Sequence, residues 1–116
     1  MSDTHGGREA DKPPFSVSET THRALGRLLT LKVGGTLTVR LTPHEAHTLA
    51  LAMVAVRDGK SAETELFMSP IASDAIFVAP VGADGISVET PGGPQALDWS
   101  AVGQLATALS PAAMAV

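Results

Sequence analysis

The chain has 116 residues, of which 44% are hydrophobic and 17% charged, and its formal net charge is −4 at pH 7. This length predicts one domain that buries a core of its own. Cysteine is absent, which excludes disulfides, thiolate nucleophiles and thiolate metal sites. The sequence therefore predicts a fold stabilised by an aliphatic core.

The sequence contains no segment suited to a membrane. Residues 1–12 carry mixed charges without an apolar run, so we expect neither a secretory signal nor a transit peptide. The longest apolar run, residues 49–56, falls short of the ~20 residues that a spanning helix needs. We therefore expect a cytoplasmic protein that does not enter membranes.

The first part of the chain is predicted to hold a tail, a short helix and a hairpin. Residues 1–14 are polar and end in two prolines, which is typical of a disordered tail. Residues 18–29 predict a short helix with Ser18 or Thr20 as its N-cap. Residues 29–33 and 36–41 alternate apolar and polar side chains around Gly34 and Gly35, which predicts a β-hairpin. Its buried face would hold Leu29, Leu31, Val33, Leu37, Val39 and Leu41, with Thr30, Lys32, Thr38 and Arg40 facing outward.

The strongest helix signal follows the hairpin. Thr42 fits the N-cap position, Pro43 the first helical position and Glu45 the third, which together make a capping box. The pattern predicts a helix over residues 43–57. Its core stripe would be Ala46, Leu49, Met53 and Val56, and the opposite side would hold His44, His47, Leu51, Val54 and Asp58. Because this opposite side also contains apolar residues, we expect it to meet a second element or a second subunit.

Short β-prone runs then recur about every ten residues, separated by turns rich in proline and glycine, and predict an antiparallel meander. The run 76–78 is apolar throughout, so we expect a central strand covered on both faces. A helix is predicted over residues 100–109, stopped by Pro111, and residues 111–116 would form a short tail. The fold class is then α+β. One antiparallel sheet of five or six strands, made of the hairpin and the meander, would pack with a central helix and a C-terminal helix in a single domain over residues 15–110.

The predicted order is a helix, two strands, a helix, three or four strands and a helix. This order resembles, in outline, roadblock-type dimerisation domains.

Two histidines on the central helix raise the question of a metal site. His44 and His47 lie three residues apart, so both imidazoles project from the same turn. The zincin pattern requires a spacing of four residues, and the sequence offers no obvious third ligand. We therefore predict no metal, and we interpret the pair either as the solvated first turn of a well-capped helix or, with Leu51 and Val54, as part of a partner interface. Because a histidine ordinarily titrates near pH ~6.5, such an interface is a candidate for pH sensitivity.

Charge is distributed unevenly along the chain. Residues 1–57 carry seven basic and five acidic side chains, whereas residues 58–116 carry one basic and seven acidic. Arg23, Arg27, Lys32 and Arg40 form a basic stripe, within which Arg23 and Arg27 would share one helix face. This stripe either contacts an anionic partner such as nucleic acid, or neutralises the acidic half of this chain or of a partner subunit.

No catalytic or cofactor signature is present. The glycine pairs fit neither a dinucleotide-binding nor a P-loop pattern, and no serine lies in a nucleophile elbow. The sequence favours a small non-catalytic protein–protein interaction module, either an adaptor, an accessory subunit or an inhibitor, that self-associates as a homodimer and needs no cofactor. The alternatives are a nucleic-acid-binding regulator that uses the basic stripe, and a small-molecule or metal-binding protein.

Overall fold

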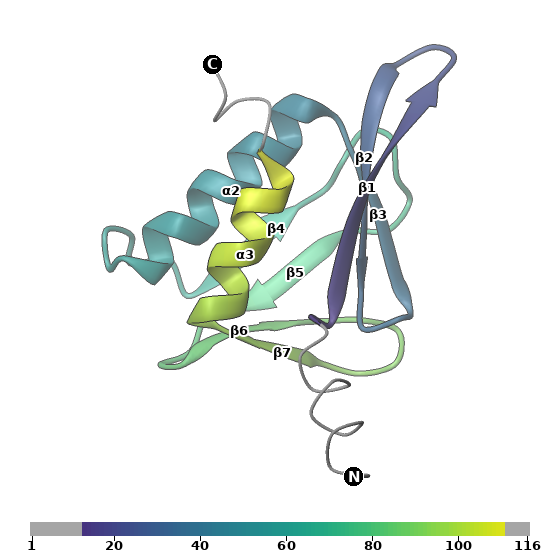
Figure 1. Cartoon of the computed structure of the whole chain (residues 1–116). Helices are drawn as coiled ribbons and strands as arrows, with labels where there is room; N and C mark the ends of the chain where they lie inside the picture. The colour runs from purple at the N-terminus through teal and green to yellow at the C-terminus, as the bar shows by residue number, and fades with distance from the viewer. Residues whose placement is uncertain (1–12, 111–116) are drawn as a thin grey trace, which may run out of the picture.

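The computed structural model describes residues 13–110, and the expected tails fall outside this range except for Pro13 and Pro14 (Figure 1). The chain forms seven strands and two helices, which confirms the α+β class. In order they are β1 (Phe15–His22), β2 (Gly26–Val33), β3 (Leu37–Leu41), α2 (Pro43–Arg57), β4 (Glu65–Met68), β5 (Phe77–Pro80), β6 (Gly85–Val88), β7 (Gln95–Asp98) and α3 (Trp99–Leu109).

The strands divide into three small antiparallel sheets. Their orders are β1-β2-β3, β4-β5 and β6-β7, so the prediction of one sheet of five or six strands is wrong. The meander itself is present, but β5 and β6 are not paired as strands. The two pairs are connected by the Val81–Ile86 bridge and by hydrogen bonds from the Glu89 N–H to the Val78 carbonyl and from the Gly82 N–H to the Gly85 carbonyl. The Thr36 hydroxyl, in the β2–β3 turn, joins the first sheet to the third by hydrogen bonds with Thr90 and Gly92.

The expected helix over residues 18–29 is wrong, because this segment forms β1, a turn and the start of β2. Residues 15–18 alternate between apolar and polar side chains, which suits a strand. Gly26 has a φ of 78°, a conformation that a helix interior does not contain. The turn is held by His22, whose Nδ1 accepts the N–H groups of Ala24 and Leu25. The outline of a roadblock-type domain required a helix here, so that resemblance does not hold.

The β2–β3 hairpin is confirmed. Leu29 pairs with Leu41 and Val33 with Leu37, leaving a turn over residues 34–36. All six residues expected on the buried face are buried, namely Leu29, Leu31, Val33, Leu37, Val39 and Leu41. Thr30 was expected to face outward into solvent, but it is also buried. It lies on the central strand between Ser18 of β1 and Arg40 of β3, and β1 was missing from the predicted sheet.

Helix α2 has the predicted bounds and the predicted start. The Thr42 hydroxyl accepts the Glu45 N–H at 3.1 Å, and Glu45 Oε1 accepts the Thr42 N–H at 2.9 Å. Glu45 Oε2 also accepts the N–H of Ile71 at 3.0 Å, so one carboxylate connects the helix start to the β4–β5 loop. The predicted core stripe is buried, and Ala50 is buried as well.

Replacing Thr42 by alanine is expected to lower the free energy of unfolding by about 1 kcal/mol, because an N-cap hydrogen bond is lost. Thr48→Ala is the matched control, since Thr48 is exposed within the same helix and alanine has the higher helix propensity. The control is expected to be neutral or slightly stabilising in urea denaturation. Equal destabilisation by the two substitutions would contradict the capping role.

The second pair of strands has one open face. Phe77 is fully buried, whereas Ile76 is 43% exposed and Phe67, which pairs with Val78, is 60% exposed. The expectation that residues 76–78 form a strand covered on both faces is therefore wrong. In the described structure both helices lie on the core side of these strands, so the outer apolar side chains remain in contact with solvent.

Helix α3 closes the domain. It begins one residue earlier than predicted, and the Asp98 carboxylate caps it by accepting the Ala101 N–H at 2.8 Å. The indole N–H of Trp99 donates to the Ala83 carbonyl at 2.8 Å, which fixes the helix start to the β5–β6 connection.

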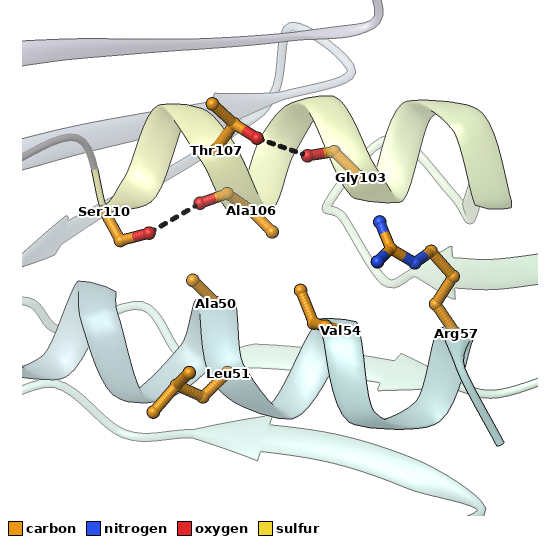
Figure 2. Close-up of a pocket in the computed structure, with 8 residues that line it drawn as sticks. All are labelled: Ala50, Leu51, Val54, Arg57, Gly103, Ala106, Thr107 and Ser110. Carbon is orange, nitrogen blue, oxygen red and sulfur yellow. Dashed lines mark hydrogen bonds between the residues drawn. The ribbon is translucent and has the colours of Figure 1, made fainter. Parts of the chain in front are cut away.

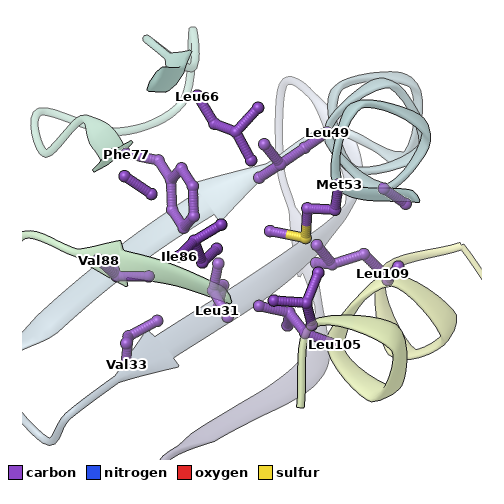
Figure 3. Packing of buried hydrophobic residues seen from close by; sticks show 14 of the residues in the cluster. Leu31, Val33, Leu49, Met53, Leu66, Phe77, Ile86, Val88, Leu105 and Leu109 are labelled. Carbon is purple, nitrogen blue, oxygen red and sulfur yellow. The ribbon is translucent and has the colours of Figure 1, made fainter. Parts of the chain in front are cut away.

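The core lies between the helices and the strands. Figure 3 shows side chains from both helices, from β2 and from the meander converging in one mainly aliphatic cluster, in which Phe77 lies near Leu66 and Ile86. The helices α2 and α3 lie side by side across this core from the β1–β3 sheet (Figure 1). Among residues 13–110, no helix is long and apolar enough to cross a membrane. The packing leaves the outer sides of α2 and α3 facing solvent next to each other.

Candidate docking face

The two helices run antiparallel and enclose a groove between their outer sides (Figure 2). The groove has a volume of about 220 Å³ and lies open to solvent. It is lined by Ala50, Leu51, Val54 and Arg57 of α2 and by Gly103, Ala106, Thr107 and Ser110 at the α3 side. Most of these side chains are small, so the helix backbones lie close together and the groove stays shallow.

We call the groove and the outer sides of the two helices the helical face. Besides the residues that line the groove, it contains His44, His47, Thr48 and Asp58 around α2 and Gln104 on α3.

The helical face contains few charged side chains. Helix α3 has no charged residue, and α2 has only Glu45 in its first turn and Arg57 in its last. A helix at the surface of a soluble protein usually presents charged side chains to solvent. On this face Leu51 and Val54 are apolar neighbours among mostly uncharged polar side chains, which makes it the candidate docking surface.

Leu51 is the most prominent apolar side chain of the helical face. It is 57% exposed, and its side chain lies at the rim of the groove (Figure 2). Val54, one turn further on, is half-buried against the same groove. The structure therefore brings together these two members of the predicted partner interface, and it adds α3 as the other wall.

The two predicted histidines have different surroundings. His44 is exposed in the first turn of α2, whereas His47 is half-buried. The Nδ1 atom of His47 is shielded from solvent and has no hydrogen-bond partner in the structure. Residues 13–110 contain no cluster of three or more histidine, cysteine, aspartate or glutamate side chains suited to a metal ion.

A charged pair marks the end of the groove. Arg57 Nε donates to Asp58 Oδ1 at 2.9 Å, and this hydrogen bond holds the pKa of the Asp58 carboxyl below its ordinary value. The Arg57 guanidinium reaches across to Gly103, where a Cβ atom would lie only 2.9 Å from Nη1. Glycine at this position therefore lets the Arg57 side chain lie against α3.

The structure does not place the four basic residues on one surface. Arg23 lies in the β1–β2 turn rather than on a helix, so it shares no helix face with Arg27. Arg27 points to the same side of β2 as the core residues and lies 3.9 Å from Glu19. Lys32 and Arg40 share the outer face of the β1–β3 sheet.

Arg40 also lines a second, shallow depression of about 600 Å³, which the loop over residues 71–75 borders on the other side. The ion pairs within residues 13–110 are Arg27–Glu19 and Arg57–Asp58. Lys32 and Arg40 therefore make no ion pair with the acidic second half of the described chain.

Sequence reasoning missed the groove and its α3 wall, including Gly103 and Thr107. The available signal was the absence of charge over residues 99–109, which the helical periodicity alone does not explain.

Comparisons with protein-family models, with curated proteins and with solved structures found no match to this chain.

Proposed function

We propose that the protein is a non-catalytic protein–protein interaction module, an adaptor, accessory subunit or inhibitor, that docks and self-associates through its helical face. The observation that carries this proposal is Leu51, an exposed leucine at the rim of an open groove in a helix layer that is nearly free of charge. Full burial of an exposed leucine side chain contributes about 1.5–3 kcal/mol, and because Leu51 is 57% exposed a partner would gain roughly half of this, about 1–2 kcal/mol.

The size of the groove favours a side chain over a free small molecule. Small-molecule sites usually enclose about 300–1,000 Å³ and surround most of the ligand. The groove is smaller, at about 220 Å³, and it is only partly enclosed. An apolar side chain presented by another protein suits this size and shape better than a free ligand does.

Nucleic-acid binding through the basic residues has less support. Lys32 and Arg40 are the two members of the stripe that share a sheet face, while Arg27 pairs with Glu19. A duplex binder generally neutralises several phosphates, and its affinity falls steeply with salt. Two cations on one sheet face provide little of this electrostatic attraction.

Affinity capture from an extract of the native cells tests the proposed function. The wild-type protein is expected to retain a stoichiometric protein partner after nuclease treatment, and Leu51→Glu is expected to lose it, because the charge must be desolvated at the interface. Leu25→Glu is the matched control, since Leu25 is 41% exposed in the β1–β2 turn. A partner lost only after nuclease treatment, or retained by Leu51→Glu, would contradict docking through the helical face.

A further inference from the structure

We propose that a second copy of this chain covers the helical face, with the two α2 helices packed antiparallel about a two-fold axis near Leu51. This inference rests on the proposed function and names the partner that fits the same surface. It is drawn from the spacing of three residues along α2, from their charges, and from the extent of the face.

His44, Leu51 and Asp58 follow each other at intervals of seven residues. Seven residues are close to two helical turns, so the three side chains lie along one side of α2, about 10 Å apart. The exposed apolar residue is thus at the centre, with a polar residue at equal distance on either side. A two-fold axis through the central residue exchanges the two ends.

In the antiparallel arrangement, Asp58 of each copy faces His44 of the other. The Asp58 carboxylate is already oriented by Arg57 at the end of the helix, and His44 is exposed in the first turn. An imidazole N–H donates to a carboxylate whether the ring is neutral or protonated. A parallel arrangement would instead oppose Asp58 to Asp58, so the charges favour the antiparallel one.

The partial charges at the ends of α2 also favour the antiparallel arrangement. The amino end of a helix carries a partial positive charge and the carboxyl end a partial negative one. Antiparallel packing places the start of α2 beside the end of α2 in the second copy, so unlike ends are neighbours. At the centre, the Leu51 side chains of the two copies pack against each other at the axis.

The extent of the face predicts a weak dimer. The 15 residues of α2 span about 22 Å, and two neighbouring helices are about 20 Å wide. The flat area is then roughly 450 Å², compared with about 800 Å² of accessible surface per partner in a standard interface. We therefore expect both helices to take part and a dissociation constant in the micromolar range.

Sedimentation velocity over a concentration series tests the dimer with purified protein. The wild type is expected to change from monomer to dimer with rising concentration. Leu51→Glu is expected to raise the dissociation constant by about 100-fold or more, because two carboxylates would meet at the axis. Leu25→Glu is expected to leave the dissociation constant unchanged, and circular dichroism checks that each variant is folded.

A charge exchange tests the antiparallel register. His44→Asp and Asp58→Lys each remove the predicted contact, and each is expected to raise the dissociation constant by roughly 2- to 30-fold, since the contact occurs twice in a dimer. The double variant restores opposite charges and is expected to recover most of the affinity. Asp at the start and Lys at the end of a helix both suit its dipole. Because Asp58→Lys also removes the Arg57–Asp58 ion pair, circular dichroism checks that each variant keeps its helix content.

The outcomes separate this inference from the proposed function. A wild type that stays monomeric up to about 1 mM overturns the dimer, as does a dimer that is insensitive to Leu51→Glu. A dimer that requires Leu51 but shows no recovery in the double variant overturns the antiparallel register. If the protein is monomeric while Leu51→Glu still abolishes capture of a different protein, the dimer and the self-association in the proposed function fail, and docking of a different protein through the helical face stands.

Discussion

Replacing Phe77 by alanine is expected to lower the free energy of unfolding by about 3–5 kcal/mol. Phe77 is the largest fully buried side chain of the described structure, and it lies in the cluster shared by both helices and the strands. Its removal loses the transfer free energy of the ring and leaves a cavity that the surrounding leucines fill only partly. Denaturation with urea, followed by circular dichroism, measures this change.

Phe67→Ala is the matched control for this prediction. Phe67 lies on the neighbouring strand and differs chiefly in its exposure of 60%. Because most of its ring is already in contact with water, the substitution is expected to change the free energy of unfolding by less than about 1 kcal/mol. Similar losses for the two variants would mean that the core is not arranged around Phe77.

The second large effect is expected at Gly85, the first residue of β6. A Cβ atom added there would clash with the backbone carbonyl of Leu97 and would lie 2.7 Å from the Cα atom of Asp98. Both atoms belong to the paired strand β7, so no side-chain rotation relieves the clash. Gly85→Ala is therefore expected to cost about 3 kcal/mol or more, through separation of β6 from β7.

Gly82→Ala is the matched control, because Gly82 lies in the β5–β6 connection just before Gly85 and has room for a methyl group. Its Cβ atom would be 3.7 Å from the Gly85 carbonyl oxygen, an ordinary van der Waals contact. The expected change is within about 0.5 kcal/mol of the wild type. Thermal unfolding of both variants tests the pair, and a Gly85→Ala protein as stable as Gly82→Ala would show that the two strands do not approach as described.

Elements with strong local signals were predictable from the sequence. The capping box fixed the start of α2, and the Gly34–Gly35 turn between alternating residues fixed the hairpin. The segment over residues 18–29 was not predictable in the same way, because its leucines suit a helix stripe as well as a strand. It forms strands because β1 pairs with β2 along the whole length of both, and the pattern of one segment does not reveal this pairing.

The candidate site likewise contains residues that the sequence predicts and others that it does not. Leu51 and His44 were identified because the periodicity of α2 alone places them opposite the core stripe. The groove was not identified, because it exists only where α3 packs beside α2, about fifty residues later in the sequence. The division of the meander into separate pairs also depends on packing, since the spacing of turns indicates strands but not which of them stay hydrogen-bonded.

The packing of α3 against α2 has a consequence for the protein during its synthesis. The ribosome completes α2 well before it reaches α3, and the chain grows by only about 5–20 residues per second. Until then α3 cannot cover the side of α2 that holds Ala50, which is buried in the folded protein. The side of α2 that α3 shields in the folded protein therefore stays accessible to water until the last part of the described chain has been made.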